Sequence, residues 1–299
     1  MKITALVITK NEEIHIERCI NNLKKLVDNI LIVDSFSTDK TVEIAEKLNV
    51  RIIKNKFVNH SKQFNFGLSQ LSDETHWVLK VDADELLTSQ LIDEIKQKLP
   101  NLDEDINGIY LKRQLIFQKK IIRYGRLFPV KLLRLFKFNT GYCDNRWVDE
   151  KIKISGKTVE FKEYFYDHNL KTLNDWIAKH NEYSSAEALN YLLSKYNFSN
   201  NDMINSKFNV EKNTIVVLKS RDFYDKFPLI IRSFMIFFFR YFICLGFLNG
   251  KTGLNYFFLQ TLWYRMVVDL KILDVEKLLK KNNSFEDAIK KKLNLRIKE

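Results

Sequence analysis

Asp82 and Asp84, two carboxylates separated by one alanine, form the residue pair with the clearest chemical meaning in this sequence. Mg²⁺ and Mn²⁺ accept one or two protein carboxylates and take their other ligands from water and phosphate oxygens. Two like charges this close are costly unless a cation neutralises them. A solvated turn after a strand gives the same pattern, so the neighbouring elements decide between the two readings.

The chain around this pair alternates strand and helix patterns. Short apolar runs rich in Val and Ile predict buried strands, and apolar residues at helical spacing predict helices. The strands are expected at residues 3–9, 29–34, 50–54 and 77–81, and the helices at 12–26, 41–48, 62–71 and 91–99. This alternation predicts a doubly wound, mostly parallel α/β sheet whose ligands bind beyond the carboxyl ends of its strands.

Polar residues stand at three of these strand ends. They are Thr9, Asn11 and Glu12 after the first strand, Asp34 and Ser35 after the second, and Asp82 and Asp84 after the fourth. An acid after a strand binds a ribose in other nucleotide sites, whereas Ser37 or Thr38 would simply cap the next helix. The sequence has no G-x-G-x-x-G and no Walker A motif, which disfavours a dinucleotide enzyme and a P-loop NTPase.

Composition and charge narrow the class of protein. The 299 residues are 45% hydrophobic with 8 Gly and 3 Pro, which excludes collagen-like and disordered chains. Three widely spaced cysteines argue against a disulfide framework. The net charge of +12 divides into −4 for residues 1–106 and +16 for residues 107–299. An acidic half suits a divalent metal, and a basic half suits phosphate, an acidic glycan, a membrane or nucleic acid.

The basic half begins with a stretch that has no acidic residue. Residues 107–143 hold nine Lys or Arg, among them Arg113 and Arg134. Guanidinium groups match phosphate oxygens well, so we expect this stretch to face a diphosphate and an acceptor; a solvated basic face has the same composition. Further strands are expected at residues 109–117, 131–138 and 164–168, with helices after residue 170.

Residues 227–248 are the most apolar and aromatic stretch of the chain. Arg232 and Arg240 would be costly inside a spanning helix. Eight residues apart, they project from roughly the same side of a helix and leave an aromatic face opposite. This pattern predicts a helix lying in the plane of a membrane surface, with a buried core helix as the alternative.

Four segments, ITALVITKNEE, ILIVDSFSTDKTVEIAEKL, KQFNFGL and WVLKVDADE, together resemble the N-terminal half of an inverting family-2 glycosyltransferase with a GT-A fold. Later features resemble a narrower bacterial branch, the lipopolysaccharide-core β-1,4-glucosyltransferase-like enzymes. These features are the strand that holds Arg134, the segment 147–152, His168 and the glycines within residues 246–254.

The resemblance implies a nucleotide-sugar donor, usually a UDP-sugar, and assigns residues to its site. It implies a nucleoside pocket lined by Thr9, Asn11, Glu12, Asp34 and Ser35, with Lys62 and Asn65 near the diphosphate or the sugar. It further implies that Asp82 and Asp84 bind Mn²⁺ or Mg²⁺ and the diphosphate, with His168 completing the metal shell. Many family members have a second Asp where this chain has Ser35.

An inverting transfer is a single displacement. It needs a general base at the acceptor hydroxyl and stabilisation of the leaving diphosphate, which a metal ion supplies as a Lewis acid. The resemblance points to Glu150 as the base. Asp149 is the alternative, and only one of the two should reach the site because adjacent strand residues face opposite sides.

Together these observations predict a GT-A catalytic domain at residues 1–170, with a donor half at 1–106 and an acceptor half at 107–170. A helical C-terminal region at 171–299 would associate with a membrane. We expect an inverting, metal-dependent transfer to a lipopolysaccharide-core or other glycan or glycolipid acceptor. The enzyme would be cytoplasmic, held at the inner face of the cell membrane, and would bind no nucleic acid. The alternatives are a nucleotidyltransferase, which would release pyrophosphate, and a basic nucleic-acid-binding protein.

Overall fold

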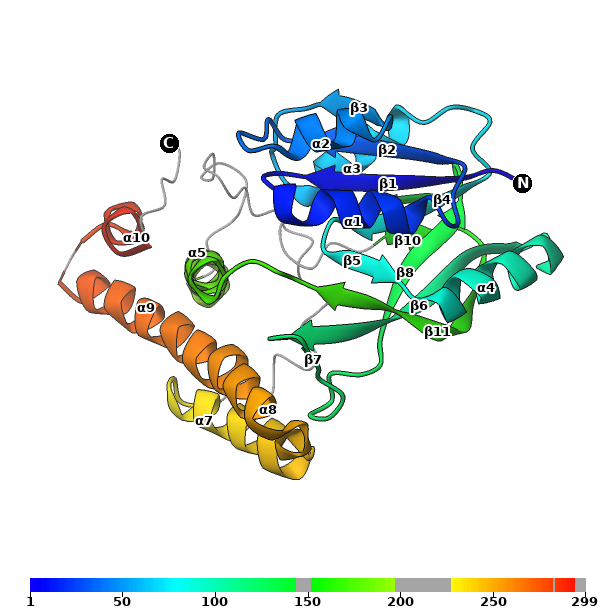
Figure 1. The fold of residues 1–299 in the computed structure, drawn as a ribbon. Helices are drawn as coiled ribbons and strands as arrows, with labels where there is room; N and C mark the ends of the chain where they lie inside the picture. Colours follow the sequence, from blue (N-terminus) through cyan, green and yellow to red (C-terminus); the bar gives the residue numbers. More distant parts are fainter. Residues whose placement is uncertain (144–151, 197–226, 282, 294–299) are drawn as a thin grey trace. The chain divides into compact units, whose positions relative to one another are not determined.

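A computed structural model describes residues 1–143, 152–196, 227–281 and 283–293 of the chain (Figure 1). The chain divides into two compact units. The first unit contains Met1–Arg123 and Leu127–Leu170, and the second contains Tyr124–Arg126 and Lys171–Glu299. Each unit has its own hydrophobic core.

The first unit is built on one large sheet. Its first four strands are parallel and lie in the order β3, β2, β1, β4. They are β1 (Ile3–Thr9), β2 (Asn29–Asp34), β3 (Arg51–Lys54) and β4 (Trp77–Asp82). Thr9 pairs with Asp34, and Ile8 pairs with Asp82. The register therefore brings the polar ends of β2, β1 and β4 to the same edge of the sheet.

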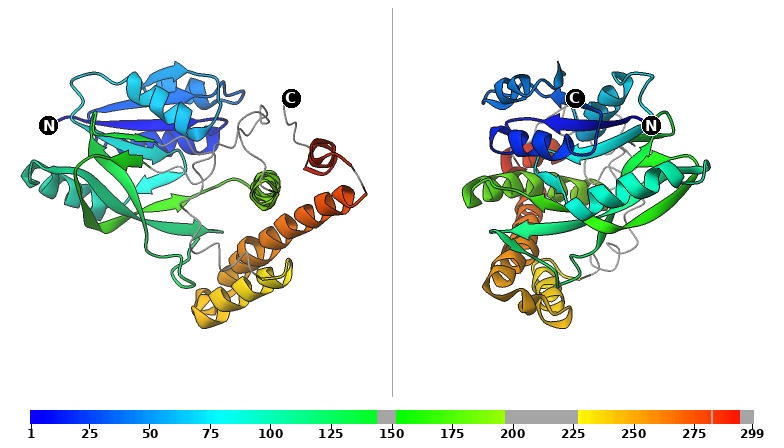
Figure 2. Two further views of the ribbon diagram at one scale, coloured as in Figure 1. Left: turned by 180° about the vertical axis from the view of Figure 1, so that it is seen from behind. Right: turned by 45° about the vertical axis from the view of Figure 1, so that its right-hand side comes forward.

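Helices cover both faces of this sheet (Figures 1 and 2). They are α1 (Glu13–Leu23), α2 (Thr41–Lys47), α3 (His60–Ser69), α4 (Ser89–Lys98) and the short η1 (Leu99–Asn101). Alternate residues of β1 supply the two cores: Ala5 and Val7 pack with α1 and α4, and Leu6 packs with Phe64 of α3. A side chain at Gly67 would meet Leu6 at 2.7 Å, so α3 can lie this close only with glycine there.

The later strands extend the sheet in mixed orientation. They are β5 (Glu85–Leu87), β6 (Ile106–Phe117), β7 (Lys120–Ile121), β8 (Val130–Lys137) and β11 (Lys157–His168). β8 is antiparallel to both β4 and β6, whereas β11 is parallel to β6 and antiparallel to β5. A separate hairpin of β9 (Gly141–Cys143) and β10 (Ile152–Ile154) flanks residues 144–151.

The second unit is helical. Its helices are α5 (Leu173–Lys195), α7 (Ile231–Phe238), α8 (Gly250–Phe257), α9 (Tyr264–Leu279) and α10 (Phe285–Leu293), with η3 (Phe239–Ile243), η4 (Gly246–Asn249) and η5 (Phe258–Trp263) between them. The α5 helix starts with a capping box between Thr172 and Asp175. The core of the second unit is formed by α5, α9 and α10, which contribute among others Leu189, Val268 and Ile289.

The predicted helix at residues 227–248 is shorter than expected. It runs from Ile231 to Ile243 and ends where Leu245 adopts a left-handed backbone conformation with φ of 60°. By length and composition, no single helix of the described residues could cross a membrane. Only the pair 231–243 and 246–279, bent by 71°, meets that test when the two are taken together.

Candidate functional site

The strand-end loops of β1 and β2 are tied together by Asp34. This fully buried carboxylate accepts hydrogen bonds from Thr9 Oγ1 at 3.1 Å and from the Ser37 backbone N–H at 2.8 Å. The neighbouring Ser35 donates its backbone N–H to the Thr9 carbonyl and accepts from Gln63 Nε2 at 3.0 Å. Three of the predicted nucleoside-pocket residues therefore form one rigid group.

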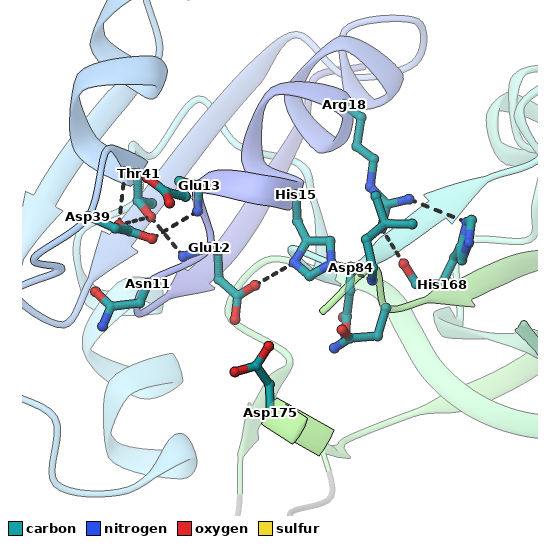
Figure 3. A network of polar contacts seen from close by, with 12 residues as sticks. Asn11, Glu12, Glu13, His15, Arg18, Asp39, Thr41, Asp84, His168 and Asp175 are labelled. Carbon is teal, nitrogen blue, oxygen red and sulfur yellow. Dashed lines mark hydrogen bonds and ion pairs between the residues drawn. The ribbon is translucent and has the colours of Figure 1, made fainter. Parts of the chain in front are cut away.

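The loop with Asn11 and Glu12 is fixed against the start of α2 (Figure 3). Asn11 has a left-handed backbone with φ of 54°, and its Oδ1 accepts from the Thr38 N–H at 2.8 Å. Glu12 donates its backbone N–H to Thr41 Oγ1 at 2.7 Å. The α2 helix has Lys40 at its N-cap and no side-chain capping bond, so the alternative in which Ser37 or Thr38 caps this helix is wrong. The segment 37–41 instead holds the loop of Asn11 and Glu12.

His15 is a member of this site that sequence reasoning gave no role. Its Nδ1 lies 2.6 Å from Glu12 Oε2, and Figure 3 shows the two side chains pointing toward one another. The other ring nitrogen, Nε2, accepts from the Leu170 N–H at 2.8 Å. Because Nε2 accepts a hydrogen bond, Nδ1 carries the ring proton and donates a hydrogen bond to the Glu12 carboxylate. The fully buried ring thus fixes the orientation of the Glu12 carboxylate.

The Asp82 carboxylate shares Arg134 with Glu85. Arg134 Nη2 lies 3.0 Å from Asp82 Oδ2 and also contacts Glu85 Oε1, while Glu85 Oε2 accepts from the Asp82 N–H at 3.0 Å. Arg134 is buried, with its guanidinium over the Phe165 ring. The structure therefore places Arg134 on protein carboxylates, and its predicted contact with a diphosphate stays a prediction.

The two carboxylates that share Arg134 differ in acidity. Burial disfavours the ionised form of Asp82, but Arg134 and Lys80 outweigh it and hold the pKa of Asp82 below its usual range. Burial dominates at Glu85 and, with the charge of Asp82, raises its pKa to about 8. Asp82 is therefore the more acidic carboxylate of the pair.

Asp167 and Arg113 lie at the edge of the same group. Arg113 Nη1 is 3.5 Å from Asp167 Oδ2. Burial and the charge of Asp84 raise the pKa of Asp167 to about 6, against the opposing effect of Arg113. The sequence analysis assigned no role to Glu85 or Asp167, because no local pattern marks an acid after Asp84 or an acid within β11.

Asp84 and His168 lie close together at the ends of β4 and β11. The His168 N–H donates to the Asp84 carbonyl at 2.9 Å, and Asn169 Nδ2 donates to Asp84 Oδ2 at 2.9 Å. Arg18 contacts the His168 carbonyl and lies 3.3 Å from its Nδ1 (Figure 3). Burial and the Arg18 charge lower the pKa of His168, which favours its neutral form.

The fit to a divalent metal is partial. Asp82 and Asp84 supply the hard carboxylate oxygens that Mg²⁺ and Mn²⁺ prefer, at the edge where the strand ends converge. Among the described residues, however, no three His, Cys, Asp or Glu side chains are arranged to hold a metal ion. A metal held by Asp82 and Asp84 and completed by ligand oxygens stays a prediction, as does a contribution from His168.

The Asn65 amide binds the backbone of Cys143, and its predicted place near the diphosphate or the sugar stays a prediction. Its Nδ2 donates to the Cys143 carbonyl and its Oδ1 accepts from the Cys143 N–H, both at 2.8 Å. Its amide therefore clamps the backbone just before residues 144–151. Asp149 and Glu150 lie outside the described residues. Lys62 is exposed in the first turn of α3, where Asn59 accepts from its N–H at 2.7 Å.

Comparison with known proteins identifies the class. The model of the family described as "Glycosyl transferase family 2" matches residues 4–144. An uncharacterized glycosyltransferase of Rickettsia felis is 32% identical over 197 residues, which cover 62% of this chain and 69% of the relative. The chain therefore belongs to glycosyltransferase family 2, as its motifs predicted, and it is a glycosyltransferase. Membership does not favour the nucleotidyltransferase or nucleic-acid-binding alternatives.

One further relative and one solved structure are similar to this chain at lower sequence identity. The lipopolysaccharide core biosynthesis glycosyltransferase LpsC of Rhizobium meliloti is 27% identical over 199 residues, covering 63% of this chain and 71% of LpsC. The crystal structure of glucosyl-3-phosphoglycerate synthase from Mycobacterium tuberculosis, in complex with Mn²⁺, UDP and glucosyl-3-phosphoglycerate, has a TM-score of 0.42. It is 15% identical, and the match covers 69% of this chain and 83% of that chain. The aligned parts span about two thirds of the length of the curated relatives.

Proposed function

We propose that the protein transfers a sugar, with inversion, from a UDP-sugar to a hydroxyl of a lipopolysaccharide-core or other glycan or glycolipid acceptor. The observation that carries the proposal is the register that gathers Thr9, Asp34 and Asp82 at one edge of three adjacent parallel strands. Ligands bind at this edge in open α/β sheets. The similarity to LpsC supports the choice of acceptor class.

The donor nucleoside would lie against the fixed loops after β1 and β2. Glu12, whose carboxylate is oriented by His15, offers an acceptor to ribose hydroxyls, and the Asn11 loop limits the space beside the base. Because these groups are held by hydrogen bonds before a ligand arrives, little side-chain entropy is lost on binding.

The aspartates would receive the diphosphate end of the donor. Asp82 and Asp84 would hold Mn²⁺ or Mg²⁺, which when bound neutralises the charge that develops on the leaving diphosphate. Arg134 keeps Asp82 ionised and fixes one of its oxygens, so that the other oxygen can point toward the ligand. Glu85 holds the Asp82 backbone and thereby the turn between the two aspartates.

Glu150 would accept the proton of the acceptor hydroxyl, with Asp149 as the alternative base. We expect Glu150→Gln to lower kcat by at least about a hundredfold, the usual contribution of a general base. Asp149→Asn is the matched control and should retain most of the activity. A loss confined to Asp149→Asn would reverse the assignment, and full activity in both variants would remove this segment from the chemistry.

The proposal is tested by ligand-dependent stabilisation. A ligand that binds only the folded state raises the melting temperature. UDP should do so with Mn²⁺ and not with EDTA, whereas ADP, GDP and CMP should have smaller effects. Incubation with a UDP-sugar and acceptor should release UDP and no pyrophosphate. No stabilisation by any nucleotide with Mn²⁺, together with no UDP release, would contradict the proposal.

His15 gives a prediction that separates donor binding from chemistry. His15→Leu removes both hydrogen bonds of the ring and frees the Glu12 carboxylate, so the KM for the donor should rise about tenfold with a smaller change in kcat. His15→Asn is the control, because its amide can still donate to Glu12. Steady-state kinetics with varied UDP-sugar would measure both. A fall in kcat alone would mean that the ring does not act through donor binding.

A further inference from the structure

The second unit carries an unusually apolar surface on residues 231–258. Twelve large hydrophobic side chains of this segment are 41% to 64% exposed. They are Ile231, Phe234, Met235, Phe238, Phe239, Phe242, Ile243, Leu245, Phe247, Leu248, Leu254 and Phe258. We call this surface the aromatic face. Contiguous apolar surface of this kind marks a site of contact with a protein or a lipid membrane.

The same segment buries polar side chains. Arg232 and Ser233 are 2% and 0% exposed and pack against Asp269 of α9. Arg232 Nε donates to Asp269 Oδ1 at 2.9 Å, and Ser233 Oγ donates to Asp269 Oδ2 at 3.2 Å. A helix on a water-soluble protein buries its apolar side and exposes its polar side. The arrangement of α7 is the reverse.

Small residues make the close contacts inside this part of the second unit. A side chain at Gly246 would meet the Arg240 carbonyl oxygen at 2.7 Å, and one at Gly253 would meet the Gly246 carbonyl oxygen at 2.8 Å. Thr252 and Thr261 are buried as well. Helices in lipid associate through small and hydroxyl side chains, because hydrophobic residues gain nothing by leaving the lipid. Small and hydroxyl side chains, together with the fully buried Phe257, therefore form the inward side of this part.

Charge and length indicate how such a segment would meet a bilayer. Besides the buried Arg232, residues 227–264 contain Arg240 and Lys251 and no acidic residue, which suits anionic headgroups. The α7 and η3 helices have eight and five residues, or about 20 Å of helix, which is less than the ~30 Å hydrocarbon core. The chain then turns, and the next helical run is bent by 71° from the first.

We propose that the aromatic face inserts into one leaflet of a bilayer rich in anionic lipid and holds the enzyme at the membrane surface. Insertion removes the exposed aromatic rings from water, while the polar Arg232–Asp269 pair stays inside the protein. A water-soluble protein partner would cover the aromatic face equally well, but it would not account for the polar and glycine-rich inward side. This proposal stands independently of the proposed function.

Flotation of the full chain with vesicles tests the proposal. The unmodified protein should float with vesicles of phosphatidylcholine and phosphatidylglycerol, and less with phosphatidylcholine alone. The triple variant Phe234→Ser, Phe238→Ser, Phe242→Ser should bind the mixed vesicles at least about tenfold more weakly, because each ring removed from the lipid lowers binding. The matched control is Leu270→Ser, Leu273→Ser, on exposed residues of α9 outside the aromatic face.

The outcomes separate the possible occupants of the aromatic face. Equal vesicle binding by the triple variant and the unmodified protein would overturn the proposal. So would an unmodified protein that forms dimers, ignores vesicles and becomes monomeric in the triple variant, because a second copy would then cover the face. Stabilisation by UDP and Mn²⁺ should be the same in all three proteins. A failure of vesicle binding therefore leaves the proposed function intact, and a failure of stabilisation by UDP leaves the membrane proposal intact.

Discussion

Asp84→Asn should lower the rate of sugar transfer by at least about a thousandfold while the protein keeps its fold. The reason is the position of Asp84 at the end of β4, where its carboxylate would help Asp82 to hold the metal at the leaving diphosphate. Asn is nearly isosteric, and its side-chain oxygen can still accept from Asn169 as Asp84 does at 2.9 Å. The substitution therefore removes the charge and keeps the local contact.

The measurement is the rate of UDP release with saturating donor, together with the melting temperature. Asp93→Asn is the control, because Asp93 is an exposed acid on α4 that lies away from the strand ends. The melting temperature of Asp84→Asn should match that of the control, but its stabilisation by UDP and Mn²⁺ should be lost. Normal turnover in well-folded Asp84→Asn would end the metal hypothesis.

The strands that form the polar sheet edge could be predicted from the sequence, because each is a short apolar run followed directly by polar residues. The strands β1 and β2 have the predicted bounds, since each is a run of buried Val, Ile and Leu that ends in polar residues. The three-residue strand β5 was missed because it follows the two aspartates directly and is too short for a period to show. The predicted strand at 164–168 is the end of the twelve-residue β11. In the earlier part of β11, charged residues alternate with uncharged ones, so no apolar run marks the strand there.

The contacts that make the site work are long-range, and a single sequence does not contain them. No local pattern marks Glu85, yet it is buried beside Arg134, which lies 49 residues away in the sequence. His15 reads as one position of an amphipathic helix, yet its ring binds the Leu170 backbone 155 residues away. Asn65 matches a family motif, but only the fold shows that its amide holds Cys143.

The orientation of the aromatic face also could not be predicted from the sequence. The apolar run at 227–248 and its two arginines were visible in the sequence, but its orientation was not. Arg232 finds its partner in Asp269, on a different helix, and this pair decides that the polar side of α7 faces inward. A hydrophobic periodicity gives the position of an apolar face and leaves open whether the core or the surroundings receive it.

Arg134→Met should cost the protein more stability than any other single substitution considered for the first unit. Arg134 is buried between Asp82 and Glu85, and Met fills its volume without replacing the positive charge or the donated hydrogen bonds. Removing one partner of a buried charge group typically costs on the order of 3 kcal/mol. For a unit of this size that corresponds to a fall in melting temperature of roughly 10 °C.

Two further variants make the Arg134 result interpretable in thermal unfolding. Arg113→Met removes a guanidinium that is half-exposed and 3.5 Å from Asp167, so it should cost less than about 1 kcal/mol. Glu85→Gln should cost less than Arg134→Met, since burial raises the pKa of Glu85 to about 8, but the amide keeps only one of the two oxygens that accept from Arg134 and the Asp82 N–H. If Arg134→Met had the same melting temperature as Arg113→Met, Asp82 would not depend on Arg134 for its charge. If Glu85→Gln were as unstable as Arg134→Met, Glu85 would be ionised, and Arg134 would neutralise two carboxylates at once.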